Sequence, residues 1–463
     1  MIPFSLKELA QELDGQLIGA DIQIEQVCSD SRQLQPGDFF IALKGPNFDG
    51  HKFVQQAAEQ GCLAALVEQQ QNVDIPQLVV ADCYKAMGKM AALVKARVNP
   101  KTVAITGSSG KTTVKEMLAA ILSRKGKVLA TKGNFNNEIG VPLTLLRLTH
   151  EHQYAVIELG ANHLGEIAYT TSLTKPDVAM INNIAAAHLE GFGSLTGVAK
   201  AKGEIFSGLP ENGVAIYNQQ ALHSNEWQWR LEKLQVKQFS STEKADCYST
   251  NARANLVGCY QFTLHTEQGE IEIELPIPGQ HNVSNAIAAA AAALEFDTSL
   301  EDIKLGLEQM TPVQGRLNLH TLSPKLTVID DTYNANVESV KAAVSLLSNF
   351  DGTRMLILGD MAELGEDARQ YHQEIGEYAQ EQGIEHLLTL GVLSQSTSAV
   401  YEQRSAHFSS RETLIKHLSD LLANSDEHFT ILVKGSRSAR MELVVKDIAQ
   451  QYPSNKGQEN SSC

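Results

Sequence analysis

The chain has 463 residues, enough for about three domains, and its 43% hydrophobic and 20% charged residues are ordinary for a globular protein. A net charge of −16 excludes a general affinity for nucleic-acid backbone, although a local loop can still bind a small anion. The six cysteines lack Cys-x-x-Cys spacing, which predicts reduced thiols of a cytoplasmic protein. We expect no signal peptide and no membrane insertion, because the N-terminus is amphipathic and no apolar run approaches about 18 residues.

The first region, residues 1–82, predicts a small α/β domain. Residues 4–13 have helical spacing, and short apolar runs with strand character follow at 38–43, 63–68 and 77–82. A turn-rich segment, "KGPNFDGHKF", occupies residues 44–53.

Residues 83–313 predict a central domain, which begins with a helical stretch at 83–98. Four short apolar runs then alternate with helical patterns, as in a parallel sheet covered on both faces. These predicted strands are 102–106, 127–131, 154–159 and 177–183. Later, the period-two alternation of residues 259–277 around Gln268 and Gly269 predicts an antiparallel hairpin at one edge, followed by an alanine-rich helix.

From residue 314 the strand–helix alternation restarts, which predicts a C-terminal Rossmann-like domain, 314–463. Its expected strands are 326–331, 354–360, 386–390 and 429–436. Several of them end in polar residues, where ligands of such sheets usually bind. The tail from about residue 454 is short and polar, and we expect it to be disordered. The predicted fold class is therefore α/β, with three domains.

The segment "AITGSSGKTT", residues 104–113, has the composition of a phosphate-binding loop but not the usual spacing. The pattern G-x-x-x-x-G-K-[ST] requires a glycine where Ile105 stands. The segment nevertheless joins a predicted buried strand to an amphipathic helix, the context that such a loop needs. Gly107 and Gly110 free the backbone to turn its N–H groups inward, Lys111 supplies a cation and Thr112 a hydroxyl for magnesium. A plain strand-to-helix turn is the alternative; the coincidence of features favours a shortened nucleotide loop.

This shortened loop resembles that of the ATP-dependent Mur ligases, and further segments resemble the same family in the same order. They are "DSRQLQPGDFFIALKGPNFDGHKF" (30–53), "KGNFNNEIGVPLTLL" (132–146), "ELGANHLGEI" (158–167), "NNIAAAHLEGFGSLTGVAKAKGEIF" (182–206), "GQHNVSNAIAAA" (279–290), "GRLN" (315–318) and "DDTYNAN" (330–336). The resemblance runs to about residue 450. One departure is Val337, where the family pattern has proline, a residue suited to a first helical turn.

The resemblance implies an ATP-dependent ligase that joins D-alanyl-D-alanine to UDP-N-acetylmuramoyl-tripeptide through an acyl phosphate. The products would be the UDP-linked pentapeptide for peptidoglycan synthesis, ADP and phosphate. We expect a cytoplasmic monomer whose partners are these small molecules and not nucleic acid. The alternatives are a Mur-type ligase for a single amino acid, a folylpolyglutamate synthetase, an ATP-gated binding protein without ligation, and a plain P-loop kinase.

The expected cofactors are ATP and two Mg²⁺ ions, since cations must shield a carboxylate that approaches a triphosphate. By resemblance the ATP phosphates contact the loop residues Gly107, Ser108, Ser109, Gly110, Lys111, Thr112 and Thr113. The expected metal ligands are Thr112, Glu158, His188 and Lys202, and the expected catalytic residues are Lys111, Glu158, His188 and Lys202.

Two of these residues have plainer interpretations, and Glu158 does not. Glu158 closes a buried strand, where solubility explains an acid poorly, but His188 alone would be a hydrogen-bonded loop histidine. Lys202 alone would be a surface helix lysine. The resemblance implies that Lys202 is carbamylated, which turns a cation into a metal ligand; Lys200 is the competing candidate.

The remaining nucleotide contacts come from two later segments. By resemblance Asn282 and Asn285 reach the adenine, although simple N-capping would also explain them. Arg316 is expected to contact the γ-phosphate and Asp331 the ribose, so the site would be completed only when the third domain closes.

The expected substrate contacts lie in three segments. For the dipeptide they are Tyr333, Asn334 and Asn336. On the muramoyl side they are Asn136 and Asn137. For uridine and its phosphates they are Ser31, Arg32 and Asn47, with Asp49 nearby. A β-turn with a solvated arginine is the alternative for this last group.

Overall fold

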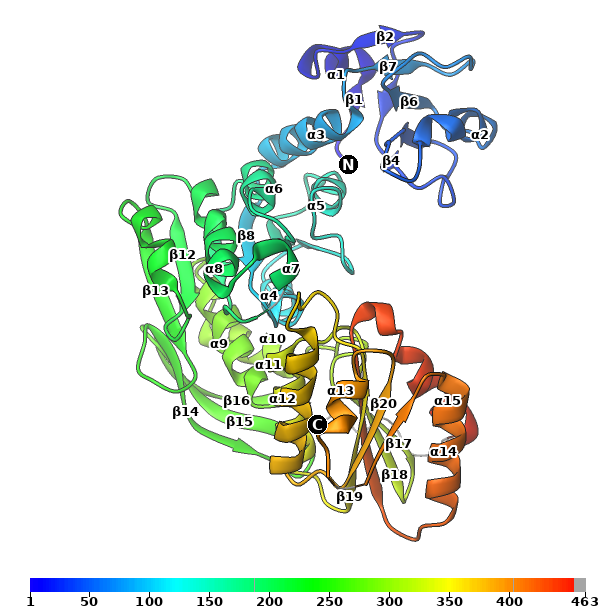
Figure 1. Ribbon diagram of the computed structural model, residues 1–463. Helices are drawn as coiled ribbons and strands as arrows, with labels where there is room; N and C mark the ends of the chain where they lie inside the picture. Colours follow the sequence, from blue (N-terminus) through cyan, green and yellow to red (C-terminus); the bar gives the residue numbers. More distant parts are fainter. Residues whose placement is uncertain (187, 403, 454–463) are drawn as a thin grey trace.

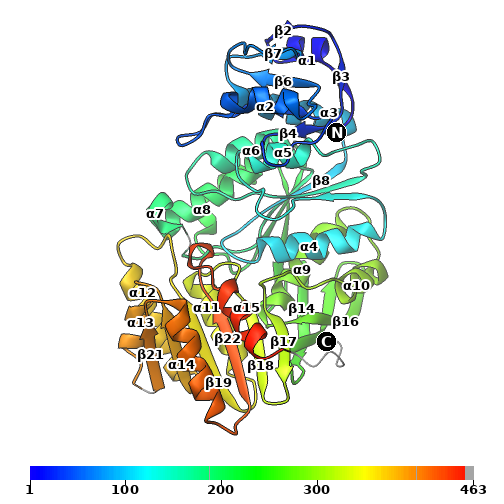
Figure 2. The same cartoon turned by 90° about the vertical axis from the view of Figure 1, so that its right-hand side faces the viewer.

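The computed structural model describes residues 1–186, 188–402 and 404–453, and three α/β regions follow one another along the chain (Figure 1). The first region lies at one end of the molecule, the third at the other, and the central region between them, as the turned view also shows (Figure 2). The predicted α/β class with three domains is confirmed. The predicted disordered tail and Cys463 lie outside the described residues.

Two sequence-based expectations concern cysteine chemistry and membranes. Cys28, Cys62, Cys83 and Cys247 are free thiols, as predicted, whereas Cys259 is disulfide-bonded, so the prediction of a reduced thiol is wrong for that residue. In the part of the chain that the structure describes, every helix is too short or too polar to cross a bilayer.

The first region contains a five-stranded sheet of order β2-β7-β6-β5-β4 in which only the β2–β7 pair is antiparallel. Its strands are β2 (Gln16–Ile18), β4 (Val27–Cys28), β5 (Phe39–Ile41), β6 (Ala64–Val67) and β7 (Gln77–Val79), with β1 (Phe4–Ser5) and β3 (Gln23–Ile24) paired separately. Its helices are α1 (Leu6–Glu12), η1 (Gly50–Phe53) and α2 (Val54–Glu59). Helix α3 (Cys83–Val98) begins where the Asp82 side chain accepts from the Lys85 N–H, and it leads into the central region.

The central region is built on a nine-stranded sheet of order β16-β15-β14-β13-β12-β11-β8-β10-β9, parallel from β9 to β14. Its strands are β8 (Lys101–Thr106), β9 (Val128–Ala130), β10 (Tyr154–Glu158), β11 (Val178–Ile181), β12 (Val214–Asn218), β13 (Gln235–Ser240), β14 (Cys247–Ala254), β15 (Cys259–Thr266) and β16 (Gly269–Pro278). The predicted edge hairpin is confirmed: β15 and β16 pair antiparallel at the border of the sheet.

Strands β10 and β11 in the middle of the central sheet are buried throughout, because helices of this region cover both faces of the sheet. These helices are α4 (Lys111–Ser123), α5 (Gly140–Leu145), α6 (Glu166–Thr174), α7 (Leu189–Phe192), α8 (Leu195–Gly203), η2 (Glu204–Gly208), α9 (His281–Leu294) and α10 (Leu300–Glu308). On one face Val103 and Ile105 pack in one core with α4 and α9. On the other face Ala104 shares a core with residues of α3 and of the first region, so these two regions have a continuous apolar interior.

The third region has a six-stranded sheet of order β17-β18-β22-β19-β20-β21, parallel except for β17. Its strands are β17 (Asn318–Ser323), β18 (Leu326–Asp331), β19 (Thr353–Gly359), β20 (His386–Leu390), β21 (Arg404–Phe408) and β22 (Phe429–Lys434). Its helices are α11 (Val337–Leu347), α12 (Ala368–Glu381), α13 (Gln395–Ala399), α14 (Arg411–Ala423), η5 (Arg437–Ala439) and α15 (Glu442–Gln451). Helices α11 and α12 pack on one face, and α14 and α15 on the other.

Candidate functional site

A cleft of about 960 Å³ lies between the central and third regions, and it is lined by residues of both. The segments that follow β8, β10 and β11 contribute one wall, and those at the ends of β18 and β22 contribute the other. The carboxyl ends of parallel strands are where open α/β sheets bind ligands.

The glycine loop forms one wall of this cleft, from Ser108 to Thr113. Gly110, directly before α4, has φ +75°, a conformation that costs glycine little and other residues more. The side chain of Lys111 folds back, and its Nζ donates to the carbonyl of Gly107 at 2.8 Å. Burial lowers the pKa of Lys111, and the nearby Glu158 carboxylate opposes that effect. The loop therefore offers backbone N–H groups, a helix N-terminus and a cation to an anion in the cleft.

A chain of amides holds this loop in place. Asn183 Oδ1 accepts from the Ser109 N–H at 2.9 Å, and Asn182 Nδ2 donates to the Ser109 carbonyl at 3.1 Å. Asn182 Nδ2 also donates to Asn285 Oδ1, and Asn285 Nδ2 donates to Asn282 Oδ1.

This chain of amides corrects the plainer interpretation of Asn282 and Asn285. Neither is an N-cap: the residue before α9 is Gln280, and no side chain caps the helix. Both are 4% exposed, line the cleft and connect α9 to the glycine loop.

Glu158 stands at the end of β10, 2% exposed, and both of its carboxylate oxygens are engaged. Its Oε2 accepts from Thr112 Oγ1 and its Oε1 from Asn136 Nδ2, each at 2.8 Å. The neighbouring Asn137 also lines the cleft, and its Oδ1 accepts from the Gly140 N–H at the start of α5. A carboxylate fixed beside the threonine of a phosphate loop has the donor chemistry that a divalent cation prefers.

His188 lines the cleft in a left-handed conformation, with φ +54°. Its Nδ1 lies 2.5 Å from Oε2 of Glu363, which belongs to the loop after β19 in the third region. The contact with His188 lowers the pKa of Glu363. The two regions therefore meet directly at this histidine.

Lys202 is 1% exposed, unlike the surface helix lysine of the plainer interpretation, which is wrong. Its Nζ lies 5.9 Å from the centre of the Phe192 ring, and no carboxylate of the described residues pairs with it. Burial, together with the charge of Lys111, places its pKa well below the ordinary value. Lys200, the competing candidate, is half-exposed and faces Glu226.

Arg316 of the third region contacts the glycine loop of the central region. Its Nη2 donates to Thr112 Oγ1 at 3.0 Å, and its guanidinium lies 4.3 Å from the centre of the Tyr333 ring. Its Nε is buried without a hydrogen-bond partner in the described part of the chain. An arginine with unused donors next to a phosphate loop has the properties required for binding a phosphoryl group.

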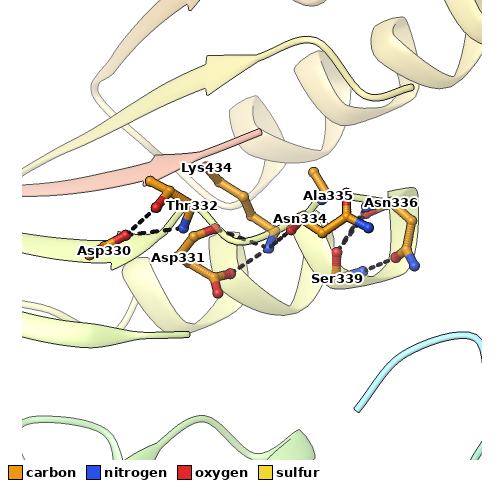
Figure 3. A network of polar contacts seen from close by, with 8 residues as sticks. All are labelled: Asp330, Asp331, Thr332, Asn334, Ala335, Asn336, Ser339 and Lys434. Atoms are coloured by element: carbon orange, nitrogen blue, oxygen red, sulfur yellow. Dashed lines mark hydrogen bonds and ion pairs between the residues drawn. The ribbon is translucent and has the colours of Figure 1, made fainter. Parts of the chain in front are cut away.

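Asp331, at the end of β18, and Lys434, at the end of β22, form an ion pair in the same wall (Figure 3). Burial raises the pKa of Asp331, and the Lys434 charge opposes that rise. Asn334 and Asn336 line the cleft as well, and Asn336 also forms a capping box with Ser339 at the start of α11.

The predicted uridine-binding residues are not brought into this cleft. Ser31, Arg32 and Asn47 belong to the first region and are absent from the cleft lining. Arg32 is largely exposed, and its guanidinium bonds to Asp30 at 2.8 Å within the same turn. The cleft thus unites the expected nucleotide, metal, muramoyl and dipeptide contacts but not the uridine contacts.

Sequence reasoning did not identify four residues that line the cleft or hold the glycine loop in place. Asn182 and Asn183 hold the glycine loop, while His281 and Lys434 line the cleft. Asn182, Asn183 and Lys434 follow or end predicted strands, which is the signal that could have identified them.

Comparisons with known proteins agree with this architecture. Three family models match the chain: "Mur ligase family, catalytic domain" at residues 23–125, "Mur ligase middle domain" at 105–293 and "Mur ligase, glutamate ligase domain" at 315–437. The UDP-N-acetylmuramoyl-tripeptide–D-alanyl-D-alanine ligase of Escherichia coli (strain K12) is 49% identical over 464 residues, which cover 100% of both chains.

Solved structures show the same relationship. A crystal structure of MurF from Acinetobacter baumannii has a TM-score of 0.92 at 40% identity, covering 97% of this chain and 99% of that chain. MurF ligase from Thermotoga maritima, solved in complex with ADP, has a TM-score of 0.82 at 26% identity, covering 92% of this chain and 98% of that one. Because the identity to the E. coli enzyme extends over the whole length of this chain, the chain belongs to the Mur ligase family.

Proposed function

We propose that this protein is an ATP-dependent ligase that joins D-alanyl-D-alanine to UDP-N-acetylmuramoyl-tripeptide. The products are UDP-N-acetylmuramoyl-pentapeptide, ADP and phosphate. The observation that carries the proposal is the hydrogen bond from Arg316 to Thr112, because it brings a third-region arginine onto the phosphate loop of the central region. The full-length identity to a ligase of this name supports the choice of substrates.

ATP fits the cleft through its phosphates. The loop from Gly107 to Thr113 would surround them, and the Lys111 ammonium would exchange its bond to the Gly107 carbonyl for a phosphate oxygen. Asn282 and Asn285 lie on the same wall for the adenine, and Asp331 on the opposite wall for the ribose. The structure of the T. maritima relative with ADP supports nucleotide binding here.

Mg²⁺ fits the same place. Thr112 and Glu158 are already within hydrogen-bond distance of each other, and His188 lines the same cleft. Within the described residues, no group of three or more His, Cys, Asp or Glu could bind a metal alone. Phosphate oxygens of the nucleotide would therefore complete the coordination of two ions, which would neutralise charge as the carboxylate approaches.

Carbamylation of Lys202 fits its surroundings. A buried ammonium without a carboxylate partner, near the charge of Lys111, is an unfavourable arrangement. A carbamate at the same Nζ would be an anion facing cations and would add a metal ligand. We propose that Lys202, and not the half-exposed Lys200, has this modification.

The chain's residues would act on the reaction mainly by positioning and charge. The tripeptide carboxylate attacks the γ-phosphate, ADP leaves, and the dipeptide amine then displaces phosphate from the acyl phosphate. Arg316 would stabilise the charge on the transferred phosphoryl group, and Asn136 would keep Glu158 oriented. Tyr333 and Asn334 would face the dipeptide, and Asn137 the muramoyl side.

The three sheets suggest a division of the substrates along the chain. We propose domain limits at 1–82, 83–313 and 314–463, with the uridine end bound by Ser31, Arg32 and Asn47 of the first domain. A monomer acting in the cytoplasm would be sufficient, since the described chain supplies both walls of the cleft.

The test is phosphate release from ATP in the presence of UDP-N-acetylmuramoyl-tripeptide, with D-alanyl-D-alanine compared against single amino acids. We expect release only with the dipeptide. Release with a single amino acid would instead identify another type of Mur ligase. Release with a folate and glutamate would identify a folylpolyglutamate synthetase, and no release with any acceptor would favour a binding protein.

A further inference from the structure

Lys434 is a buried lysine whose three donors all point at one short segment. It is 2% exposed, and a lysine is rarely buried so fully unless it is paired. Its Nζ lies 2.5 Å from Oδ2 of Asp331, 3.0 Å from the main-chain oxygen of Asn334 and 3.5 Å from that of Asp331 (Figure 3). The two strands that carry Lys434 and Asp331 are parallel neighbours, and these two residues are directly opposite each other.

A second contact joins the same two strand ends. Asn334 Oδ1 accepts from the N–H of Ala335 at 2.9 Å and from the N–H of Arg437 at 3.4 Å. The capping box at Asn336 then fixes where α11 begins. The segment from Asp331 to Asn336 is therefore held at its start, its middle and its end, with Lys434 holding the first two.

We infer that Lys434 is a positioning residue that holds the Asp331 carboxylate and the Asn334 main chain as one unit. The inference rests on the proposed function, in which Asp331 faces the ATP ribose and Asn334 the dipeptide. One side chain would then set the nucleotide contact through Asp331 and the acceptor contact through Asn334.

The charges around Asp331 give this arrangement a measurable signature. Lys434 on β22 and Arg316 before β17 both face Asp331 and oppose the rise in its pKa that burial causes. His281, at the start of α9, faces Lys434. His281 is exposed in the cleft, and desolvation by its surroundings together with the Lys434 charge lowers its pKa below the ordinary value. His281 is therefore neutral near pH 7 and cannot replace the lysine charge.

Removing Lys434 should therefore raise the pKa of Asp331 further. An ionised Asp331 accepts from a ribose hydroxyl, and this ability is lost as the pH falls through its pKa. The acid-side loss of ADP affinity should consequently begin at a higher pH, by about 1–3 pH units, when the opposing cation is absent.

The first experiment measures ADP affinity by calorimetry from mildly acidic to mildly basic pH. Lys434→Met should weaken ADP binding about tenfold to a hundredfold, the usual range for loss of a charge-assisted hydrogen bond. It should also move the acid-side loss of ADP affinity to a higher pH. Lys434→Arg should keep the pH dependence of ADP affinity close to that of the wild type, because it keeps the charge. Lys341→Met is the matched control, since Lys341 pairs with Glu374 elsewhere in the third region. Equal behaviour of the two methionine variants would overturn the inference.

The second experiment is a double-mutant cycle with Asp331→Asn. If Lys434 acts on ADP through Asp331, the double variant should bind ADP no more weakly than Asp331→Asn alone. Lys434→Met should also raise the KM for D-alanyl-D-alanine severalfold. Asp331→Asn should leave this KM nearly unchanged, because Lys434 keeps its bond to the main-chain oxygen of Asn334 in that variant. The proposed linkage would be contradicted if the two substitutions weakened ADP binding by independent factors in the double variant. It would also be contradicted if Lys434→Met left the KM for D-alanyl-D-alanine unchanged.

Two controls keep the outcomes separate. Lys434→Met leaves Asp331 as an unpaired buried charge and could for that reason fail to fold. In that case the double variant, which removes both charges, is used instead, and its KM for D-alanyl-D-alanine is compared with that of Asp331→Asn. Dipeptide-dependent phosphate release by the wild-type protein is measured first. Its absence would contradict the proposed function, whereas its presence with unaffected variants would contradict only the role of Lys434.

Discussion

Lys111 is the residue whose removal should affect the chemistry most. Its ammonium lies on the phosphate loop beside Gly107, where a triphosphate would place its negative charge. We expect Lys111→Ala to lower acceptor-dependent phosphate release by about 10²–10³ or more, because no neutral side chain can replace a preorganised cation. The rate is measured at saturating substrates, with thermal unfolding recorded in parallel.

Lys127→Ala is the control for Lys111→Ala. Lys127 belongs to the same region but is half-exposed and pairs with Glu151 away from the cleft. Its variant should keep the wild-type rate. Wild-type ligation by Lys111→Ala would refute the assignment of the loop as the ATP site.

At Lys202 the expected chemistry can be tested without mutating the loop. If its Nζ carries a carbamate, removal of bicarbonate and carbon dioxide from the buffer should lower phosphate release severalfold, and added bicarbonate should restore it. Lys202→Ala should be inactive and insensitive to bicarbonate, whereas Lys200→Ala should respond like the wild type. A wild-type rate that is independent of bicarbonate would show that the lysine acts unmodified.

At the scale of the element, the turn from β8 into α4 depends on one glycine. A Cβ on Gly110 would lie 2.5 Å from both Asn182 Nδ2 and Asn285 Oδ1, and φ there is +75°. We expect Gly110→Ala to destabilise the protein by about 2–4 kcal/mol and to abolish ADP binding, because the amide chain must move. Urea unfolding and calorimetry check the two parts.

Gly133→Ala separates backbone strain from crowding. Gly133 has φ +57°, but nothing lies within 4 Å of the position that a Cβ would occupy there. The variant should lose only about 1–2 kcal/mol of stability, the usual cost of a left-handed alanine, and should leave ADP binding intact. Equal losses in both variants would mean that contacts with the amide chain are unimportant.

Elements with a strong local pattern could be predicted from the sequence, and the others could not. Helix α3 and strands β18 and β20 have the predicted bounds, because their apolar residues follow a clear period. Strands β17 and β21 were missed: "NLHTLS" and "RSAHF" are mostly polar, and pairing with a neighbour, not local propensity, makes them strands.

The same distinction applies to the site. The glycine loop can be identified from its own residues, and the family resemblance points to Glu158 and Asp331. No local pattern could predict that Arg316 meets Thr112 across 204 positions, or that Lys202 is buried beside a ring. These facts arise from packing between elements that are distant in the sequence.

For the whole molecule, the separation of Arg32 from the cleft predicts a selective defect. Arg32 belongs to an exposed turn of the first region, so its loss should weaken only the substrate that extends there. We expect Arg32→Ala to raise the KM for UDP-N-acetylmuramoyl-tripeptide about tenfold, within the range for loss of a charged hydrogen bond, and to leave ADP affinity unchanged. A parallel loss of ADP affinity would contradict the division of substrates among the domains.

The bond between Arg316 and Thr112 also bears on how the protein is made. A ribosome completes the phosphate loop long before it reaches residue 316, and Lys434 follows still later. During that interval the opposite wall of the cleft does not yet exist. We expect a nascent or truncated chain to be unable to hydrolyse ATP, so that turnover becomes possible only once the last strand of the third sheet has been synthesised.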